Sequence, residues 1–411
     1  MKALSSLAPE VRQYLLVTGN YWAFTLTDGA LRMLVVLHFH SLGYSPLQIA
    51  ALFVFYEFFG VVTNLVGGYL GAHIGLNRTL NIGLATQVVA LLMLTVPSAM
   101  LTIPWVMGAQ ALSGIAKDLN KMSAKSSIKL LVPDTQQGKL YQWVAILTGS
   151  KNALKGVGFF LGGALLALLD FRGAVLAMAL VLGLIWIGSM LSLKKDLGKA
   201  KAKPKFRDLL SKSRAINILS AARLFLFAAR DVWFVIALPV YLSATFGWDF
   251  WLVGGFLAAW VIGYGIVQSL APALTGKKRG HVPDERAAFA WAMLLAVLPA
   301  AIAIGLTTGL PAKTVVLGGL MLFGALFAVN SSLHSYLIVS YAKEDGVSLD
   351  VGFYYMSNAM GRLIGTLLSG WVFQAYGLVA CLWISTAFVL LAAVISSVLP
   401  RHVEEATTSQ Q

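Results

Sequence analysis

The sequence alternates long apolar runs with short polar breaks, and this pattern limits the fold more than any other feature. Twelve apolar runs have centres near residues 27, 58, 89, 114, 154, 182, 229, 260, 297, 327, 364 and 389. A helix of about 20 apolar residues crosses the hydrocarbon core of a bilayer. Only 12% of the residues are charged, against about 25% in soluble domains. The sequence therefore predicts an all-α membrane protein with twelve transmembrane helices.

The lysines and arginines between the predicted helices indicate the orientation of the chain. One set of connections holds most of them, including nine in residues 194–214, whereas the other set holds only Arg172 and Lys313. Basic connections stay in the cytoplasm. We therefore expect a multi-pass monomer in the bacterial cytoplasmic (inner) membrane with both termini cytoplasmic. The net charge of +14 reflects this orientation and requires no nucleic-acid partner.

A basic stretch after the sixth apolar run divides the chain. We predict an N-terminal six-helix half (residues 1–193), a cytoplasmic linker (194–213), a C-terminal six-helix half (214–400) and a cytoplasmic tail (401–411). Two six-helix halves related by a repeat, with a site between them, are typical of transporters. The segments "LKGVGFFLGGALL" and "GRLIGTLLSGWVF", together with the first and seventh runs, align Gly158 with Gly365, Gly163 with Gly370, Lys155 with Arg362 and Asp28 with Asp231.

The turn after the second run, "GGYLGAHIGLNR" at residues 67–78, resembles the signature of the major facilitator superfamily. Gly68, Leu70, Gly75 and Arg78 match the signature, whereas Ala72 stands where it has an aspartate. The resemblance implies the major facilitator fold. The departure at Ala72 argues against an acid-based gating latch at this loop.

Charged residues inside the predicted spans indicate a watery cavity. A central lysine, arginine or aspartate costs about 2.5–3.5 kcal/mol on insertion scales. The summed cost of eight lipid-facing cations would therefore exceed the net stability of a folded protein, which is about 5–15 kcal/mol. Most must line a cavity or meet counter-ions. The embedded cations are Arg32, Lys117, Lys121, Lys151, Lys155, Arg223, Arg230 and Arg362, and the embedded acids are Asp28, Glu57, Asp118 and Asp231.

An excess of cations favours an anionic small-molecule substrate, because arginine donates paired hydrogen bonds to oxyanions and lysine supplies a mobile charge. We expect the four acids to act in coupling or charge pairing. The predicted substrate-binding residues are Arg32, Lys117, Lys121, Lys151, Lys155, Arg230 and Arg362.

Other roles remain open for several of these residues. The lysines at 117, 121, 125 and 129 share one helix face, which would be solvated if the fourth span ended early. Lys151 and Lys155 could pair with Asp28 or Asp118. Arg223 could extend to the cytoplasmic surface, and Glu57 could carry a proton or make a structural hydrogen bond.

The sequence contains no Walker loop, metal-ligand spacing or nucleophile elbow, and it has the single cysteine Cys381. We therefore expect neither enzymatic activity nor a cofactor or metal. Gradients or exchange would supply the energy for transport.

The stretches "YWAFTLTDGALRMLVVLHFHSLGYSP" (21–46), "YEFFGVVTNLVGGYLG" (56–71) and "SGIAKDLNKMSAKSSIKLL" (113–131) resemble the ArsJ family of organoarsenical efflux permeases. The resemblance implies export of 1-arseno-3-phosphoglycerate and hence arsenate resistance. It also implies a functional partnership with a glyceraldehyde-3-phosphate dehydrogenase that makes this compound. We expect Arg32 and Arg230 to bind one oxyanion head and the lysines at 117, 121, 151 and 155 to bind the other.

Two alternatives share the fold. One is an organophosphate/phosphate antiporter without a role in arsenic resistance. The other is a proton-coupled drug exporter in which Asp28, Glu57 and Asp231 are the working carboxylates. The cation excess argues against the second.

Overall fold

The computed structural model describes residues 8–44, 49, 52–133, 135–193, 197–201, 212–275 and 285–400. These residues are almost entirely helical and contain no β-strand. Most of the predicted linker and the whole predicted tail lie outside them. The helices are α2 (Pro9–Ser41), α4 (Val54–Ile74), α5 (Leu76–Met93), η1 (Ser98–Met100), α6 (Ile103–Leu131), α7 (Gln137–Ser192), α8 (Arg214–Phe234), α9 (Ala237–Phe246), α10 (Phe250–Leu274), α11 (Glu285–Thr307), α12 (Ala312–Tyr341) and α13 (Val347–Ser396).

Two of these helices, α7 and α13, each consist of two arms. Asp170 interrupts α7 with a φ of 58°, and Gly377 interrupts α13 with a φ of 79°. Asp170 lies 12 residues after Gly158, and Gly377 lies 12 residues after Gly365, so the turns occupy equivalent places in the repeat. Glycine adopts this backbone freely, and the Asp170 carboxylate stabilises its turn by accepting a hydrogen bond of 2.9 Å from the Gly173 amide.

The arrangement confirms the predicted fold. With α7 and α13 counted as two arms each and α8 and α9 as one broken span, the helices correspond to the twelve predicted runs. Six described segments meet a strict length and apolarity requirement for crossing a membrane: Gln137–Ser192, Arg214–Phe246, Trp251–Leu274, Arg286–Thr307, Ala312–Tyr341 and Val347–Ser396.

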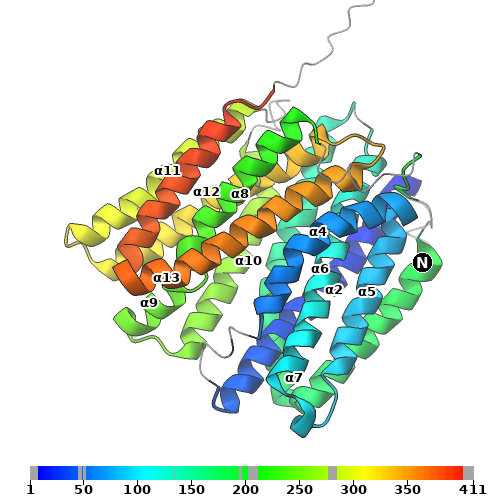
Figure 1. The fold of residues 1–411 in the computed structure, drawn as a ribbon, viewed down its shortest axis with the longest axis horizontal. Helices are drawn as coiled ribbons and strands as arrows, with labels where there is room; N and C mark the ends of the chain where they lie inside the picture. The colour runs from blue at the N-terminus through cyan, green and yellow to red at the C-terminus, as the bar shows by residue number, and fades with distance from the viewer. Residues whose placement is uncertain are drawn as a thin grey trace, which may run out of the picture.

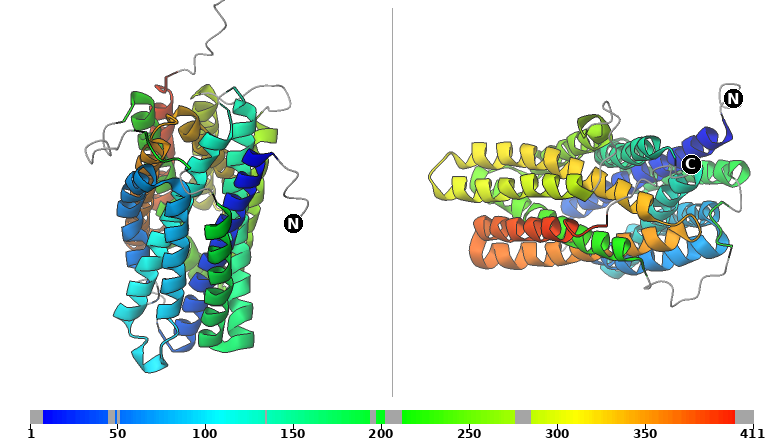
Figure 2. Two further views of the ribbon diagram at one scale, coloured as in Figure 1. Left: turned by 90° about the vertical axis from the view of Figure 1, so that its right-hand side faces the viewer. Right: turned by 90° about the horizontal axis from the view of Figure 1, so that it is seen from above.

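The two halves lie side by side, with α2 to α7 on one side and α8 to α13 on the other (Figures 1 and 2). They meet where α4 packs on α13 and α7 packs on α10. Glycines permit the close approach: a Cβ on Gly68 would lie 3.2 Å from the Gly352 Cα.

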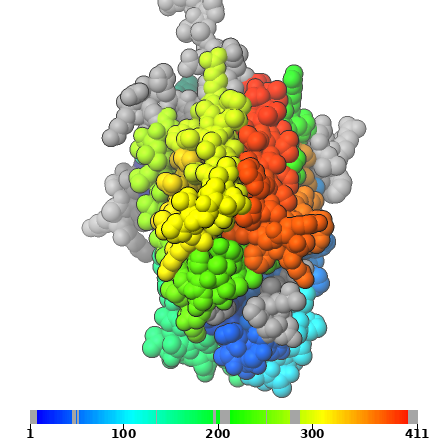
Figure 3. Space-filling model, turned by 90° about the vertical axis from the view of Figure 1, so that its left-hand side faces the viewer, coloured from blue at the N-terminus to red at the C-terminus, as the bar shows by residue number. Residues whose placement is uncertain are grey.

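The outer surface is apolar. Figure 3 shows a face built by α11, α12 and the second arm of α13, and these helices carry exposed side chains such as Leu294, Met321 and Val394. Exposed apolar surface on this scale is suited to lipid.

The halves are also tied together at the end of the bundle that carries the linker, here called the linker end. The Ser348 hydroxyl donates to the Gly68 carbonyl at 2.8 Å. Linker residues contribute as well, because the Ala200 amide donates to the Ala72 carbonyl at 2.8 Å and the Lys201 amide donates to Asp345 at 3.0 Å. At Ala72, where the family signature has an aspartate, a backbone contact with the linker is therefore present.

The glycines that align in the two halves make equivalent contacts. A Cβ on Gly158 would lie 2.8 Å from the Leu26 carbonyl oxygen on α2, and a Cβ on Gly365 would lie 2.8 Å from the Ala228 carbonyl oxygen on α8. Each half thus packs its first helix tightly against its fifth. The sequence repeat reflects this packing requirement.

Replacing Gly365 with alanine should destabilise the protein, because the new methyl group would meet the backbone of α8. We expect a loss of about 1–3 kcal/mol, as for other overpacked sites, seen as a lower midpoint of thermal unfolding in detergent. Gly318→Ala is the matched control, since a Cβ there meets nothing within 4 Å and alanine favours a helix by about 1 kcal/mol. Equal midpoints for the two variants would contradict this account.

Candidate functional site

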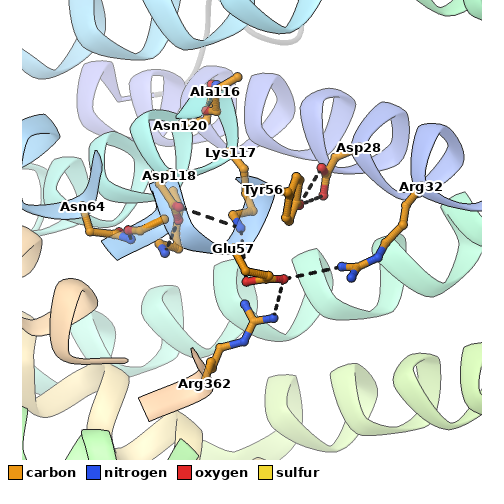
Figure 4. A network of polar contacts seen from close by, with 12 residues as sticks. Asp28, Arg32, Tyr56, Glu57, Asn64, Ala116, Lys117, Asp118, Asn120 and Arg362 are labelled. Carbon is orange, nitrogen blue, oxygen red and sulfur yellow. Dashed lines mark hydrogen bonds and ion pairs between the residues drawn. The ribbon is translucent and has the colours of Figure 1, made fainter. Parts of the chain in front are cut away.

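Charged side chains from both halves gather in the interior of the bundle (Figure 4). The helices α2, α4, α6 and α7 contribute from the N-terminal half, and α8 and α13 from the C-terminal half. The four lysines that share one face of α6, here called the lysine ladder, belong to this interior. The side chains of Lys117 and Lys121 are 11% and 13% exposed, and Lys125 and Lys129 are each 3% exposed. The interpretation of the ladder as a solvated face is therefore wrong.

Glu57 on α4 is the centre of the arrangement. Its Oε1 accepts a hydrogen bond of 2.9 Å from Arg362 Nη2 on α13 and lies 3.8 Å from Arg32 Nη1 on α2. Its Oε2 lies 4.0 Å from Lys117 Nζ on α6. The contact with Arg362 joins the two halves, so Glu57 bridges them.

Asp231 on α8 extends the contacts into the C-terminal half. Its Oδ1 lies 2.5 Å from Arg230 Nε, and its Oδ2 accepts from Arg362 Nε at 3.3 Å. Arg32, Glu57, Arg362, Asp231 and Arg230 therefore form one continuous chain of alternating charges. Arg32 and Arg230, assigned by sequence to the same substrate head, stand at opposite ends of this chain.

Asp28 on α2 has two partners in its own half. The Tyr56 hydroxyl donates to its carboxylate at 2.7 Å, and Lys155 Nζ on α7 lies 3.9 Å away. Since Asp28 aligns with Asp231 and Lys155 with Arg362, the repeat places equivalent ion pairs in both halves. The possible pairing of Lys155 with Asp28 is confirmed.

Asp118 holds the middle of the lysine ladder. Its Oδ1 lies 2.5 Å from Lys121 Nζ, and its Oδ2 lies 3.8 Å from Lys117 Nζ. Every embedded carboxylate thus has a cationic partner. We call these ten residues the ion-pair network: Asp28, Arg32, Glu57, Lys117, Asp118, Lys121, Lys155, Arg230, Asp231 and Arg362.

Aromatic rings support the cations. Lys117 Nζ lies 3.9 Å from the ring centroid of Tyr56, and the Arg32 guanidinium lies 5.4 Å from the same ring. Arg230 lies 4.8 Å from the Phe227 ring. Aromatic faces attract cations, so Tyr56 is a part of the site that the sequence reasoning missed. Its position beside an embedded glutamate was the available signal.

Within the part of the chain that the structure describes, three further cations make hydrogen bonds to neutral groups only. Lys151 donates to Asn152 Oδ1 at 3.1 Å, and Lys125 donates to the Tyr355 hydroxyl and to Ser335 Oγ. Arg223, which the sequence allowed to reach the surface, is 2% exposed and donates to Asn358 Oδ1 at 2.9 Å. We call Lys125, Lys151 and Arg223 the inner cluster.

The arrangement is suited to binding an anion. The described residues hold no group of three metal-ligating side chains. The two arginines nearest Glu57, Arg32 and Arg362, keep 29% and 28% of their side-chain surface exposed. Partly exposed cations inside a protein are available to a soluble anion.

Comparisons with known proteins identify the class of molecule. Residues 15–347 match the Major Facilitator Superfamily. The fold is similar to that of the E. coli fucose:proton symporter, with a TM-score of 0.73 at 14% identity, covering 94% of this chain and 99% of that one. It is also similar to the human organic anion transporter MFSD10, with a TM-score of 0.73 at 16% identity, covering 95% and 100%.

A proton:xylose symporter gives a TM-score of 0.75 at 13% identity, covering 95% of this chain and 97% of that one. At these identities the likeness concerns the fold. A comparison with curated protein sequences gives no match. The chain belongs to the major facilitator superfamily: it is a multi-pass membrane protein and a transporter of the secondary type.

Glu57 and Arg362 should be energetically coupled. Either single change, Glu57→Gln or Arg362→Gln, leaves charged partners unbalanced, whereas the double change removes both members. We expect a coupling energy within the usual range of about 0.5–3 kcal/mol, reduced by solvent because both side chains are about one quarter exposed. Denaturant titration in detergent micelles gives the four free energies of unfolding. Additive effects, like those expected for Glu57→Gln combined with the distant Lys313→Gln, would contradict the coupling.

Proposed function

We propose that this transporter exports an organic oxyanion, and that its cargo is 1-arseno-3-phosphoglycerate. The observation that carries the proposal is the charge of the interior. The ion-pair network and the inner cluster together hold nine basic side chains and four carboxylates, a formal excess of five positive charges. An anion with several negative charges offsets such an excess, whereas a cation or a neutral sugar does not.

The contacts of Glu57 suggest how binding would be linked to movement. A substrate oxyanion bound to Arg362 competes with Glu57 for the same guanidinium donors, since a bidentate arginine contact needs both N–H groups of one edge. This competition weakens the contact between the halves. The halves would then rock about the occupied site, as in alternating access, provided that the substrate binds the two states differently.

The arsenical cargo is supported by the resemblance of three N-terminal stretches to the ArsJ permeases. Such a cargo has a phosphate at one end and an acyl arsenate at the other. A glyceraldehyde-3-phosphate dehydrogenase would supply it from arsenate, and export would confer arsenate resistance. The basic connections support a bacterial inner-membrane location with the linker end in the cytoplasm, from which the cargo would be loaded.

Of the two alternatives, an organophosphate/phosphate antiporter uses the same cations and remains the second candidate. A proton-coupled exporter of cationic drugs is disfavoured, because Asp28, Glu57 and Asp231 are each engaged by a cation or a tyrosine hydroxyl. A cationic drug would have to displace these internal partners.

Everted membrane vesicles containing the protein test the cargo. We expect arsenic accumulation only when arsenate, glyceraldehyde-3-phosphate, NAD and the dehydrogenase are all supplied. Vesicles without the protein are the control. If arsenate alone gives the same uptake, or if the complete mixture gives none, the arsenical proposal fails. Exchange of labelled phosphate for an organic phosphate would then favour the antiporter.

Arg230 can be tested in the same vesicles. Among the described residues its guanidinium has one carboxylate partner and two aromatic neighbours, so we expect Arg230→Ala to lower uptake at least about tenfold, which corresponds to one charge-assisted contact. Arg172→Ala, an exposed arginine, should leave uptake unchanged. Normal uptake by Arg230→Ala at normal protein levels would remove Arg230 from the site.

A further inference from the structure

We propose that the inner cluster of Lys125, Lys151 and Arg223 is an anion subsite, which takes the second oxyanion head of the substrate. The inference rests on the proposed function and adds a binding position to it. The ion-pair network would hold one head and the inner cluster the other. By sequence, the second head was assigned to Lys117, Lys121, Lys151 and Lys155. The present assignment keeps Lys151 and exchanges the other three, which are paired with carboxylates, for Lys125 and Arg223, whose described hydrogen bonds are to neutral groups.

The first argument is missing counter-charge. Among the described residues no carboxylate lies within 4 Å of any inner-cluster cation. The charges that act on Lys125 are those of Arg223, Lys151 and Lys121, all positive, and those that act on Lys151 are three cations and the more distant carboxylate of Asp28. Lys125 and Arg223 are 3% and 2% exposed, so water screens little of this repulsion. Buried charges require a partner or a low-cost neutralisation, and a bound anion would supply one.

The second argument is the hydrogen-bond chain that positions these cations. Lys151 donates to Asn152, whose Nδ2 donates to Gln268 Oε1 at 2.5 Å. Gln268 Nε2 donates to Ser331 Oγ at 3.1 Å, and the Ser331 carbonyl accepts from Arg223 Nη1 at 3.2 Å. Helices α7, α10, α12 and α8 thus hold two like charges in one neutral polar chain. Such positioning is expected of a binding site.

The third argument is unused hydrogen-bonding capacity. A guanidinium has five N–H donors, and the bonds to Asn358 and Ser331 use two of those of Arg223. Beside it, both ring nitrogens of the fully buried His334 and the hydroxyl of Tyr354 have no hydrogen-bond partner. Arg223 acts electrostatically on His334 and lies 5.3 Å from the Tyr354 ring. Buried polar groups are normally satisfied, so these groups beside Arg223 have hydrogen-bonding capacity that an anion could use.

The position of the cluster is suited to a substrate with two heads. Lys125, Lys151 and Arg223 lie nearer the linker end of α6, α7 and α8 than Lys121, Lys155 and Arg230 do. Arg223 and Arg230 are seven residues apart, and a helix rises about 1.5 Å per residue, so their backbones are separated by roughly 10 Å along α8. An anion with heads separated by a short carbon chain could reach from one set of cations to the other.

The test measures binding of 3-phosphoglycerate and of inorganic phosphate to the purified full-length protein in detergent. The two probes differ in having two anionic heads or one. Binding is followed by the rise in the thermal unfolding midpoint at matched ionic strength. We expect 3-phosphoglycerate to bind the unaltered protein, and Lys125→Gln and Arg223→Gln each to weaken it at least tenfold. Lys313→Gln, which removes a cation beside Trp248, should have no effect.

Two results would overturn the subsite. If Lys125→Gln and Arg223→Gln bind 3-phosphoglycerate as the unaltered protein does, the inner cluster is not a binding site, although the proposed function stands. If neither probe binds the unaltered protein, the proposed function fails and the subsite fails with it.

Arg223→Lys and Lys151→Gln are included in case Arg223→Gln does not fold. If Arg223→Lys still binds 3-phosphoglycerate and Lys151→Gln does not, the subsite is supported. If both variants still bind it, the subsite is excluded.

Discussion

The contact between Glu57 and Arg362 is the interaction on which the interior depends. It joins α4 to α13 across the two halves at 2.9 Å, and both residues also hold other charges. If either were absent, neighbouring charges of one sign would face each other inside the bundle. The cost of burying charge therefore ties the relative position of the halves to the charge state of a single glutamate and a single arginine. An anion that takes over the arginine changes that balance directly.

The internal repeat explains much of the remaining organisation. The aligned glycines bring the first helix of each half against the fifth, and the aligned pairs Asp28 with Lys155 and Asp231 with Arg362 lie on these same helices. The halves differ in what their carboxylates contact next. Asp28 is bound by a tyrosine of its own half, whereas the partner of Asp231 also reaches Glu57 in the other half. The break in symmetry creates the ion pair between Glu57 and Arg362 that joins the halves.

The sequence was sufficient for the fold and for finding the embedded charges. Apolar runs of bilayer length report helices directly, and a charge inside such a run is conspicuous because it is costly. The ion-pair partners of these charges were harder to predict, because Glu57 and Arg362 are 305 residues apart and only tertiary packing brings them together. The placing of Lys125 was missed for the same reason, and the burial of Arg223 was one of two outcomes that the sequence left open. Lys125 lies towards the end of α6 and contacts Ser335 and Tyr355 of the other half, whereas Arg223 lies towards the start of α8 and is held by Asn358 and Ser331 of its own half.

The two sets of cations differ in a way that bears on transport. An anion entering the ion-pair network must replace a carboxylate, so its binding there is an exchange of partners with little net gain in charge pairing. An anion entering the inner cluster would meet cations that have neutral partners only, so its charge pairing would be a net gain. Affinity would then come mainly from the inner cluster. Binding to the ion-pair network would instead weaken the contact between the two halves. A substrate with a single head could satisfy one requirement, whereas a substrate with two heads could satisfy both.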